Sequence, residues 1–291
     1  MKGFIPYILN VNGRLFDLSE PCVMGILNAT PDSFYAGSRK QTEAEIEARA
    51  DSIMADGGKI IDIGAYSTRP GAAKVTASEE MERMRMALTA VRRVQPDALL
   101  SVDTFRPEVA EMAVEEFGVG IINDVSGGNP EGSFGGEKAD DCPVDASCNT
   151  VPPMFSMVAR LGVPYVLMSS CADVMSIMQD FARKVQMLRD LGAKDIILDP
   201  GFGFGKTLAD NYALLAGMGR LRELGLPVLA GVSRKSMISR LLDTDAEGSL
   251  NGTIVVNTLA MVMGEASILR VHDVKECVEA VTIVKETMRY V

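Results

Sequence analysis

Three acceptor-rich residues of this 291-residue chain each follow an apolar run, where a strand would end. Asp103 ends LLSVD, Asn123 lies in IIND, and Asp199 ends IILD. Two carboxylates and an amide form a planar set of hydrogen-bond acceptors, which suits a heterocycle with several N–H and amino groups. The alternative is that these residues cap the helices that follow them. Three of them at matched positions favour a binding site.

Four cationic side chains lie at or just beyond other strand ends: Arg69, Lys235, Arg270 and His272. If they converge, they would bind a diphosphate and stabilise it as a leaving group. His272 is the only histidine of the chain. A lone histidine is more often a packed or surface residue, but its position beside Arg270 and Asp273 favours a functional role.

An oxygen-rich loop follows the first apolar run and contains Asn28, Thr30, Asp32 and Ser33. Mg²⁺ prefers a few oxygen ligands of this kind and completes its shell with water and substrate phosphate. The alternative is a simple turn, because Pro-Asp-Ser is good turn chemistry.

The glycine-rich run GFGFGKT (201–207) is not a nucleotide-binding loop. A Walker A motif requires glycine at the position that Pro200 occupies, and the run does not match G-x-G-x-x-G. Most of the 18 methionines are expected in the core, although Met168 could line an aromatic ligand.

Eight segments that read as strands carry these polar ends, and helical stretches lie between them. Apolar runs of four to six residues are typical of strands that are covered on both faces. The expected strands are 22–27, 59–63, 98–102, 120–123, 164–168, 195–198, 227–231 and 267–271. The pattern predicts a (β/α)₈ TIM barrel as a single domain over residues 1–291, with its site at the C-terminal ends of the strands.

Three further segments complete the prediction. Residues 5–18 read as a hairpin around Asn12-Gly13, placed to close the bottom of the barrel. The helices are expected over 42–56, 78–94, 106–117, 174–191, 209–224, 251–264 and 273–289. Residues 129–153 are rich in Gly, Pro, Asp and Ser and predict a long surface loop, either passive or overhanging the site.

Composition excludes several classes of function. The net charge of −10 disfavours binding to nucleic acid or to an anionic membrane. No apolar run reaches the roughly 20 residues that a membrane helix needs. The five scattered cysteines and the absence of a signal-like start favour reduced thiols and a cytoplasmic location, with a Cys142–Cys148 pair as the alternative.

Taken together and in order, LNATPDSF, STRPGA, SVDTF, INDVSGG, DPGFGFGKT, SRKS and RVHDV resemble the dihydropteroate synthase family over nearly the whole chain. The resemblance implies a barrel enzyme of folate biosynthesis, usually a homodimer and a target of sulfonamides. It implies that p-aminobenzoate is joined to 6-hydroxymethyl-7,8-dihydropterin diphosphate, with Mg²⁺ present.

The resemblance also implies roles for individual residues. The pterin would be held by Asp103, Asn123, Asp199 and Lys235, with Met168 and Phe204 beside it. The diphosphate would be held by Asn28, Arg270 and His272, with Mg²⁺ near Asn28. The loop with Thr68, Arg69 and Pro70, together with Ser236, would receive p-aminobenzoate. Lys235, Arg270, His272 and Arg69 would be the catalytic residues.

Two departures from the family pattern keep other functions open. Ala36 stands near a position that is usually acidic, and Ser169 stands where the family commonly has histidine. They motivate a pterin-binding paralogue without synthase activity. A pterin-dependent methyltransferase would keep the Asp/Asn/Asp set, but it has no need for STRPGA, SRKS and RVHDV.

Overall fold

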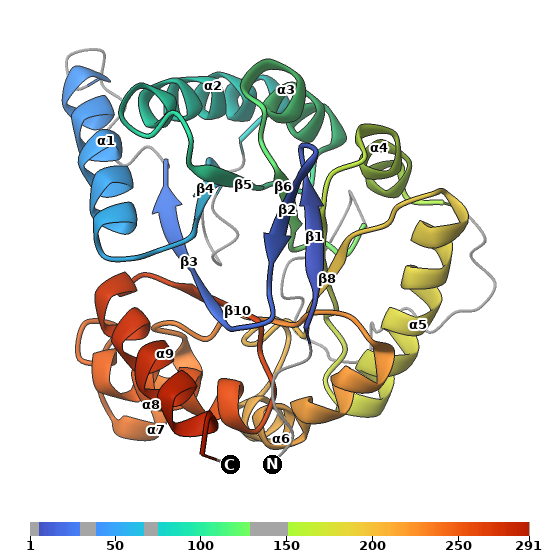
Figure 1. Cartoon of the computed structure of the whole chain (residues 1–291), viewed down its shortest axis with the longest axis vertical. Coiled ribbons are helices and arrows are strands. Elements are labelled where there is room, and N and C mark those ends of the chain that lie inside the picture. Colours follow the sequence, from blue (N-terminus) through green and yellow to red (C-terminus); the bar gives the residue numbers. More distant parts are fainter. Residues whose placement is uncertain (1–5, 30–38, 67–74, 129–150, 291) are drawn as a thin grey trace.

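The computed structural model describes residues 6–29, 39–66, 75–128 and 151–290, with side chains from 42 onward in the second range. Within these ranges an eight-stranded parallel sheet curls into a barrel that helices surround (Figure 1). Its strand order is β8-β7-β6-β5-β4-β3-β10-β9. The barrel closes between β8 and β9, the two ends of this order, through a bridge between Leu198 and Val228, and the Leu198 N–H donates to Pro227 O at 2.9 Å. The predicted (β/α)₈ barrel is therefore confirmed.

The barrel strands are close to those expected and differ by at most two residues at either end. They are β3 (Cys22–Asn28), β4 (Ile60–Gly64), β5 (Leu99–Asp103), β6 (Ile121–Asp124), β7 (Tyr165–Met168), β8 (Ile196–Asp199), β9 (Leu229–Ala230) and β10 (Ile268–Val271).

The helices lie outside the strands. They are α1 (Arg39–Ala55), α2 (Ala77–Val94), α3 (Pro107–Phe117), α4 (Pro153–Leu161), α5 (Val174–Asp190), α6 (Leu208–Gly217), α7 (Ser236–Leu242), α8 (Leu250–Val262) and α9 (Val274–Met288). The single helix expected over 209–224 is wrong in its second half, because α6 ends at Gly217 and a 3₁₀ helix follows over Met218–Leu224.

Helix α4 was not expected, and it begins at the end of the segment read as a loop. Pro153 occupies its first turn, where a missing N–H costs nothing. Met154, Phe155 and Val158 bury one face of the helix, and Gly162 ends it in a left-handed conformation. The rest of the 129–153 segment, up to residue 150, lies outside the described residues.

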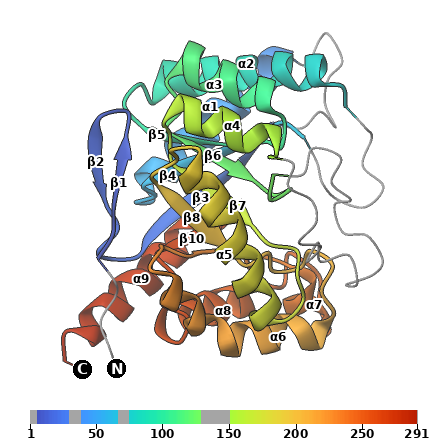
Figure 2. The same cartoon turned by 90° about the vertical axis from the view of Figure 1, so that its right-hand side faces the viewer.

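The predicted hairpin covers one end of the barrel. Strands β1 (Ile8–Val11) and β2 (Arg14–Asp17) are antiparallel, and Asn12 and Gly13 both have positive φ, as a tight two-residue turn requires. Leu9 and Val11 pack in one apolar cluster with interior residues such as Ile60. Figure 2 shows the hairpin at the end of the barrel where the strands begin.

The barrel interior changes from apolar to polar within two residues along β4, β6, β8 and β10, whereas β7 stays apolar at Met168. The layer against the hairpin contains Ile60, Ile121, Val166, Ile197 and Ile268. Strand side chains alternate between the two faces, so residues two positions further also point inward. These residues are Asp62, Asn123, Met168, Asp199 and Arg270. The polar layer is therefore separated from the hairpin by the apolar layer and lies toward the C-terminal ends of the strands.

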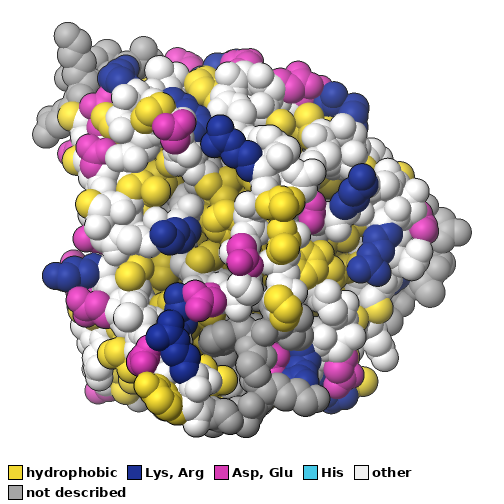
Figure 3. All heavy atoms as spheres, in the orientation of Figure 1, with side chains coloured by type: hydrophobic (Ala, Val, Ile, Leu, Met, Phe, Trp, Pro, Cys, Tyr) yellow, Lys and Arg dark blue, Asp and Glu magenta, His cyan; other side chains and the backbone are white. Residues whose placement is uncertain are grey.

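The cysteine and surface expectations have mixed outcomes. Cys22 and Cys277 are free and buried, whereas Cys171 is disulfide-bonded, so the expectation of reduced thiols does not hold for Cys171. No helix among the described residues is long and apolar enough to span a bilayer. On the face that carries the hairpin, acidic and basic side chains are interspersed (Figure 3).

Candidate active site

The structure brings the three predicted acceptor residues to the same end of the barrel. Asp103 and Asp199 end β5 and β8, and Asn123 is paired in register with Asp103. Asn123 and Asp199 are buried. None of the three caps the following helix, since the N-caps of α3, α4 and α6 are Arg106, Pro152 and Thr207. The helix-cap alternative is therefore wrong.

Arg270 lies at the centre of this polar layer and joins two carboxylates. Its Nε donates to Asp62 Oδ2 and its Nη2 to Asp103 Oδ2, both at 2.6 Å. Asp62 Oδ2 also accepts from Asn123 Nδ2 at 3.1 Å. The guanidinium thus holds the interior side chains of three neighbouring strands and β10 in one network.

Asp62 is a site residue that sequence reasoning missed. It lies in the middle of the apolar run IIDIG and has no exposed surface. A carboxylate buried inside a strand costs several kcal/mol unless it is paired. A charged residue at an inward position of an otherwise apolar strand was therefore the available signal.

Burial and charge oppose each other at the acidic residues. Burial raises the pKa of Asp103 to about 7, the attraction of Arg270 lowers it, and the repulsion of Asp62 raises it again. Burial also raises the pKa of Asp199, against the attraction of Lys235. Burial alone would lower the pKa of Arg270, but Asp62 and Asp103 outweigh it and raise that pKa. Arg270 therefore remains charged.

Lys235 approaches the layer from the start of α7, where it is the N-cap residue. Its Nζ donates to Phe202 O and lies 4.6 Å from the centroid of the Phe204 ring. Gly203 has a φ of +81°, and a Cβ there would meet Lys235 Cδ at 3.0 Å, so the glycine permits this close approach. Burial lowers the pKa of Lys235 to about 8, opposed by Asp199.

Lys206 is a second lysine near the site that was not predicted. Its Nζ donates to Gly201 O at 2.9 Å and to Phe204 O at 3.4 Å, so it braces the glycine-rich turn. Burial lowers its pKa to about 8. The signal was the GKT sequence, which was considered only as a phosphate loop. Ser236, the first residue of α7, is exposed.

His272 follows β10 directly and is fixed at three atoms. Its Nδ1 lies 3.0 Å from Ser233 Oγ, and its backbone N–H donates to the same oxygen at 3.1 Å. Its carbonyl accepts from Arg49 Nη2 at 2.6 Å. Burial lowers the pKa of His272 to about 4, and repulsion from Arg270 contributes. Neither Ser233 nor Arg49 was predicted.

Two oxygen atoms that could ligate a cation lie near Gly64, at the C-terminal ends of β3 and β5. Asn28 Oδ1 and Asp103 Oδ2 each lie 3.9 Å from where a Cβ on Gly64 would be. Amide and carboxylate oxygens fit a hard cation such as Mg²⁺. Among the residues that the structure describes, no cluster of three or more acidic, histidine or cysteine side chains could hold a metal by itself. Thr30, Asp32, Ser33 and Ala36 lie outside the described residues.

Thr68, Arg69 and Pro70 also lie outside the described residues, but both flanks of their segment are anchored. Arg106 Nη2 donates to Val75 O at 2.6 Å, and its guanidinium carbon lies 5.3 Å from the Tyr66 ring centroid. Arg106 is held in turn by the buried carboxylate of Glu80. One guanidinium therefore fixes the residues before and after the STRPGA segment.

Met168 and Ser169 end the β7 region. Met168 is buried at the inward position above Val166. Ser169 Oγ donates to Asp180 Oδ2 of α5 at 2.8 Å, and Lys184 Nζ lies 2.9 Å from the same oxygen. The serine that departs from the family pattern thus binds a buried ion pair on the helix behind the sheet.

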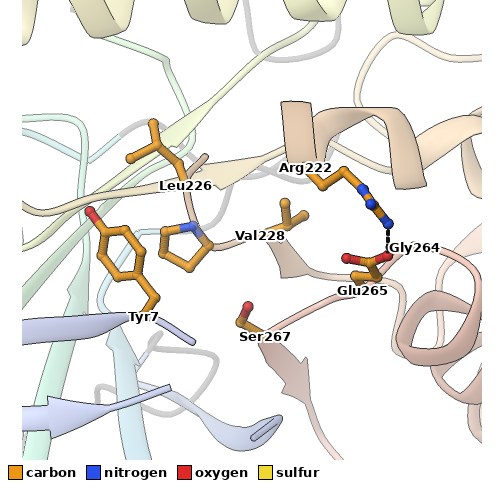
Figure 4. Close-up of a pocket in the computed structure, with 8 residues that line it drawn as sticks. Tyr7, Arg222, Leu226, Val228, Gly264, Glu265 and Ser267 are labelled. Carbon is orange, nitrogen blue, oxygen red and sulfur yellow. Dashed lines mark hydrogen bonds and ion pairs between the residues drawn. The ribbon is translucent and has the colours of Figure 1, made fainter. Parts of the chain in front are cut away.

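A separate pocket lies at the opposite end of the barrel (Figure 4). It lies where β9 and β10 begin, and the Arg222–Glu265 ion pair borders it. Its lining residues are Tyr7, Arg222, Leu226, Pro227, Val228, Gly264, Glu265 and Ser267. None of the predicted site residues that the structure describes contributes to it.

Known proteins resemble this chain over nearly its whole length. Residues 24–272 match the family described as pterin binding enzyme. The dihydropteroate synthase of Escherichia coli is 37% identical over 285 residues, covering 96% of each chain. That of Streptococcus pyogenes is 36% identical over 286 residues, covering 95% of this chain and 99% of the relative. This chain therefore belongs to the pterin-binding enzyme family.

Solved structures narrow the class further. The Xanthomonas albilineans dihydropteroate synthase with 4-aminobenzoic acid has a TM-score of 0.81 and 36% identity, covering 97% of this chain and 98% of that one. The same enzyme in complex with 7,8-dihydropteroate has a TM-score of 0.80 and 34% identity, covering 97% and 99%. Within the family, the chain groups with the dihydropteroate synthases.

Proposed function

We propose that this chain joins p-aminobenzoate to 6-hydroxymethyl-7,8-dihydropterin diphosphate, giving 7,8-dihydropteroate and diphosphate. The observation that carries the proposal is the network of Arg270 with Asp62, Asp103 and Asn123 at the C-terminal ends of the strands. The relatives named dihydropteroate synthase, one of them solved with 4-aminobenzoic acid, support it.

In this proposal the acceptor layer recognises the pterin. Asp103, Asn123 and Asp199 supply carboxylate and amide groups that pair with ring N–H and amino groups. Met168 lies beside them, and Lys235 sits against the Phe204 ring. Below pH 8 the Lys235 ammonium supplies positive charge next to Asp199. The pterin would be oriented with its methylene carbon toward the barrel mouth.

The reaction is a substitution at that methylene carbon. The neutral arylamine nitrogen forms the new C–N bond while the C–O bond to diphosphate breaks, and the nitrogen then loses one proton. Arg270 and His272 stabilise the departing anion, and Thr68, Arg69 and Ser236 receive p-aminobenzoate. Catalysis comes from orientation and from neutralising the leaving group, so no strong base is required.

We also propose that Mg²⁺ is bound near Asn28. Asn28 Oδ1 and Asp103 Oδ2, which both lie near Gly64, support this assignment. A magnesium ion bound there would neutralise phosphate charge, with water and substrate oxygens completing its shell. The expected result is that diphosphate release requires Mg²⁺ and is lost with a chelator.

The test of function is diphosphate release from purified protein with Mg²⁺, pterin diphosphate and p-aminobenzoate, with dihydropteroate confirmed by mass. Release that depends on p-aminobenzoate supports the synthase. Pterin binding without release would indicate the inactive paralogue, and methyl transfer from a folate to a cobalt cofactor would indicate the methyltransferase.

A pair of variants on one strand tests the site. Asp199→Asn should weaken pterin binding, because the amide replaces one acceptor by a donor. Asp195→Asn is the matched control, since Asp195 precedes β8 at the plugged end and accepts from the Asn10 N–H. Equal pterin affinity in the two variants would contradict the placement of the pterin.

We propose that the protein is a homodimer through α8. Val255, Leu259 and Met263 recur every four residues and are 50%, 36% and 48% exposed. Leu241 and Leu242 at the end of α7 extend this apolar surface, because Leu242 packs over Gly252 of α8. A two-fold axis would pair the surface with itself and remove it from water.

The test of the dimer is the mass in solution by light scattering. Leu259→Glu should yield a monomer, whereas Leu15→Glu on the exposed face of the hairpin should leave the mass unchanged. A native protein that is already monomeric at micromolar concentration would contradict the proposal.

We further propose a cytoplasmic location, which the free thiols of Cys22 and Cys277 support and the disulfide of Cys171 does not.

A further inference from the structure

The side chain of Ser233 contacts His272 twice, at the ring and at the backbone. Ser233 Oγ lies 3.0 Å from His272 Nδ1 and accepts the His272 backbone N–H at 3.1 Å. Ser233 is 6% exposed and lies three residues beyond the end of β9, while His272 lies one residue beyond the end of β10. The contact therefore joins the ends of two neighbouring strands.

The hydrogen bonds of the hydroxyl leave one arrangement of protons. A serine hydroxyl has one hydrogen to donate and two lone pairs. One lone pair already accepts the His272 N–H. Among the described residues, the acceptor within reach of the hydroxyl hydrogen is His272 Nδ1. A buried hydroxyl without an acceptor would be costly, so Nδ1 must present its lone pair.

We infer that Ser233 is a positioning residue that holds His272 as the neutral tautomer with its proton on Nε2, so that Nε2–H is the donor offered to the barrel mouth. The two ring nitrogens are distinct, and the partner of one sets the state of the other. Resting on the proposed function, the acceptor for Nε2–H is an oxygen of the substrate diphosphate.

The charges around the ring favour the same neutral state. Arg270, Arg234 and Arg49 all oppose a positive imidazole. The carboxylate of Asp273, which would favour a positive ring, is bound by Arg234 through two hydrogen bonds of 2.8 and 2.6 Å. Burial and these cations disfavour the imidazolium, consistent with a pKa of about 4.

This state limits what His272 can do in the reaction. With Nδ1 occupied by Ser233 and Nε2 protonated, the ring has no free lone pair to take the arylamine proton. It acts instead as a fixed neutral donor to the leaving group, and the arginines supply the positive charge. The arylamine proton therefore leaves by another route, to water or to the diphosphate.

The experiment uses ¹⁵N-histidine-labelled protein, in which the single histidine gives one pair of ring-nitrogen signals. Two-dimensional proton–nitrogen spectra at pH 7 should show Nε2 protonated and Nδ1 as an unprotonated nitrogen. Ser233→Ala should convert this into a mixture of tautomers, and Ser233→Thr should restore the native pattern. Ser239→Ala is the matched control, since its hydroxyl donates to the Ser236 carbonyl instead.

A kinetic measurement complements the spectra. Ser233→Ala should raise KM for pterin diphosphate by the inverse of the fraction that keeps its proton on Nε2, which is about twofold for an equal mixture of tautomers, and Ser233→Thr should recover the native KM. A proton on Nδ1 in the native protein, or an unchanged tautomer in Ser233→Ala, would overturn the inference. The native spectrum needs no variant and no turnover, so it separates this inference from the proposed function.

Discussion

Removing the Asp62 carboxylate should destabilise the fold, because Asp62 is a buried partner of Arg270. Its Oδ2 accepts from Arg270 Nε at 2.6 Å and from Asn123 Nδ2 at 3.1 Å, and the residue has no exposed surface. Breaking a buried ion pair by removing one partner costs roughly 3–5 kcal/mol. In Asp62→Ala, Arg270 keeps its bond to Asp103 at 2.6 Å.

Because Arg270 also binds the carboxylate of Asp103, the loss of unfolding free energy should lie at the lower end of that range. Asp62 raises the pKa of Asp103 by repulsion, so its removal lowers that pKa and favours the charged Asp103 that Arg270 needs. We therefore expect Asp62→Ala to lose about 3 kcal/mol of unfolding free energy. For a chain of this size the melting temperature should fall by roughly 6 °C.

The assay is urea unfolding followed by far-UV circular dichroism, because the chain contains no tryptophan. Asp62→Asn should lose less than Asp62→Ala, since its amide oxygen can still accept from Arg270. Its NH₂ can occupy the position of Oδ1, which has no hydrogen-bond partner among the described residues. Asp97→Ala, on an exposed loop, is the control and should stay within about 0.5 kcal/mol of native. An Asp62→Ala protein as stable as this control would refute the reasoning.

Three other perturbations have defined outcomes. The kcat/KM for pterin diphosphate should fall as pH rises through about 8, where Lys235 loses its proton. Lys235→Arg should move this fall to higher pH. A native pH profile that is flat above pH 8 would exclude a role for the Lys235 charge in the reaction. Arg49 donates to the carbonyls of Ile26 and His272 at 3.2 and 2.6 Å. Arg49→Met should therefore lose about 2 kcal/mol of unfolding free energy in urea and raise KM for pterin diphosphate. An unchanged KM would mean that the site does not need this link between the ends of β3 and β10. Burial raises the pKa of Asp103 from 3.8 to about 7. A carboxyl group with a raised pKa gives stability that is present below pH 3.8 and lost as the pH rises through 7, so the stability of native protein relative to Asp103→Asn should fall between those pH values. A constant difference would show that the pKa is not raised.

Local patterns in the sequence were sufficient for the fold and for much of the polar layer. Apolar runs alternating with helical stretches predicted all eight barrel strands, because strand and helix periods are properties of short segments. The residues that end those runs, such as Asp103 and Asp199, could be identified for the same reason. The hairpin turn at Asn12-Gly13 was equally local, since its backbone needs positive φ at both residues.

The tertiary structure alone decided which side chains meet. Asp62 and Arg270 are 208 residues apart, and they touch because β3 lies between β4 and β10 and inward positions alternate along each strand. Arg49 donates to the carbonyls of Ile26 and His272. These two residues directly follow Gly25 and Val271, the last pair between β3 and β10, so only the register of the two strands brings their carbonyls together. Short segments carry the periodicity that forms a barrel, whereas the contacts inside it depend on register and closure, which no single segment contains.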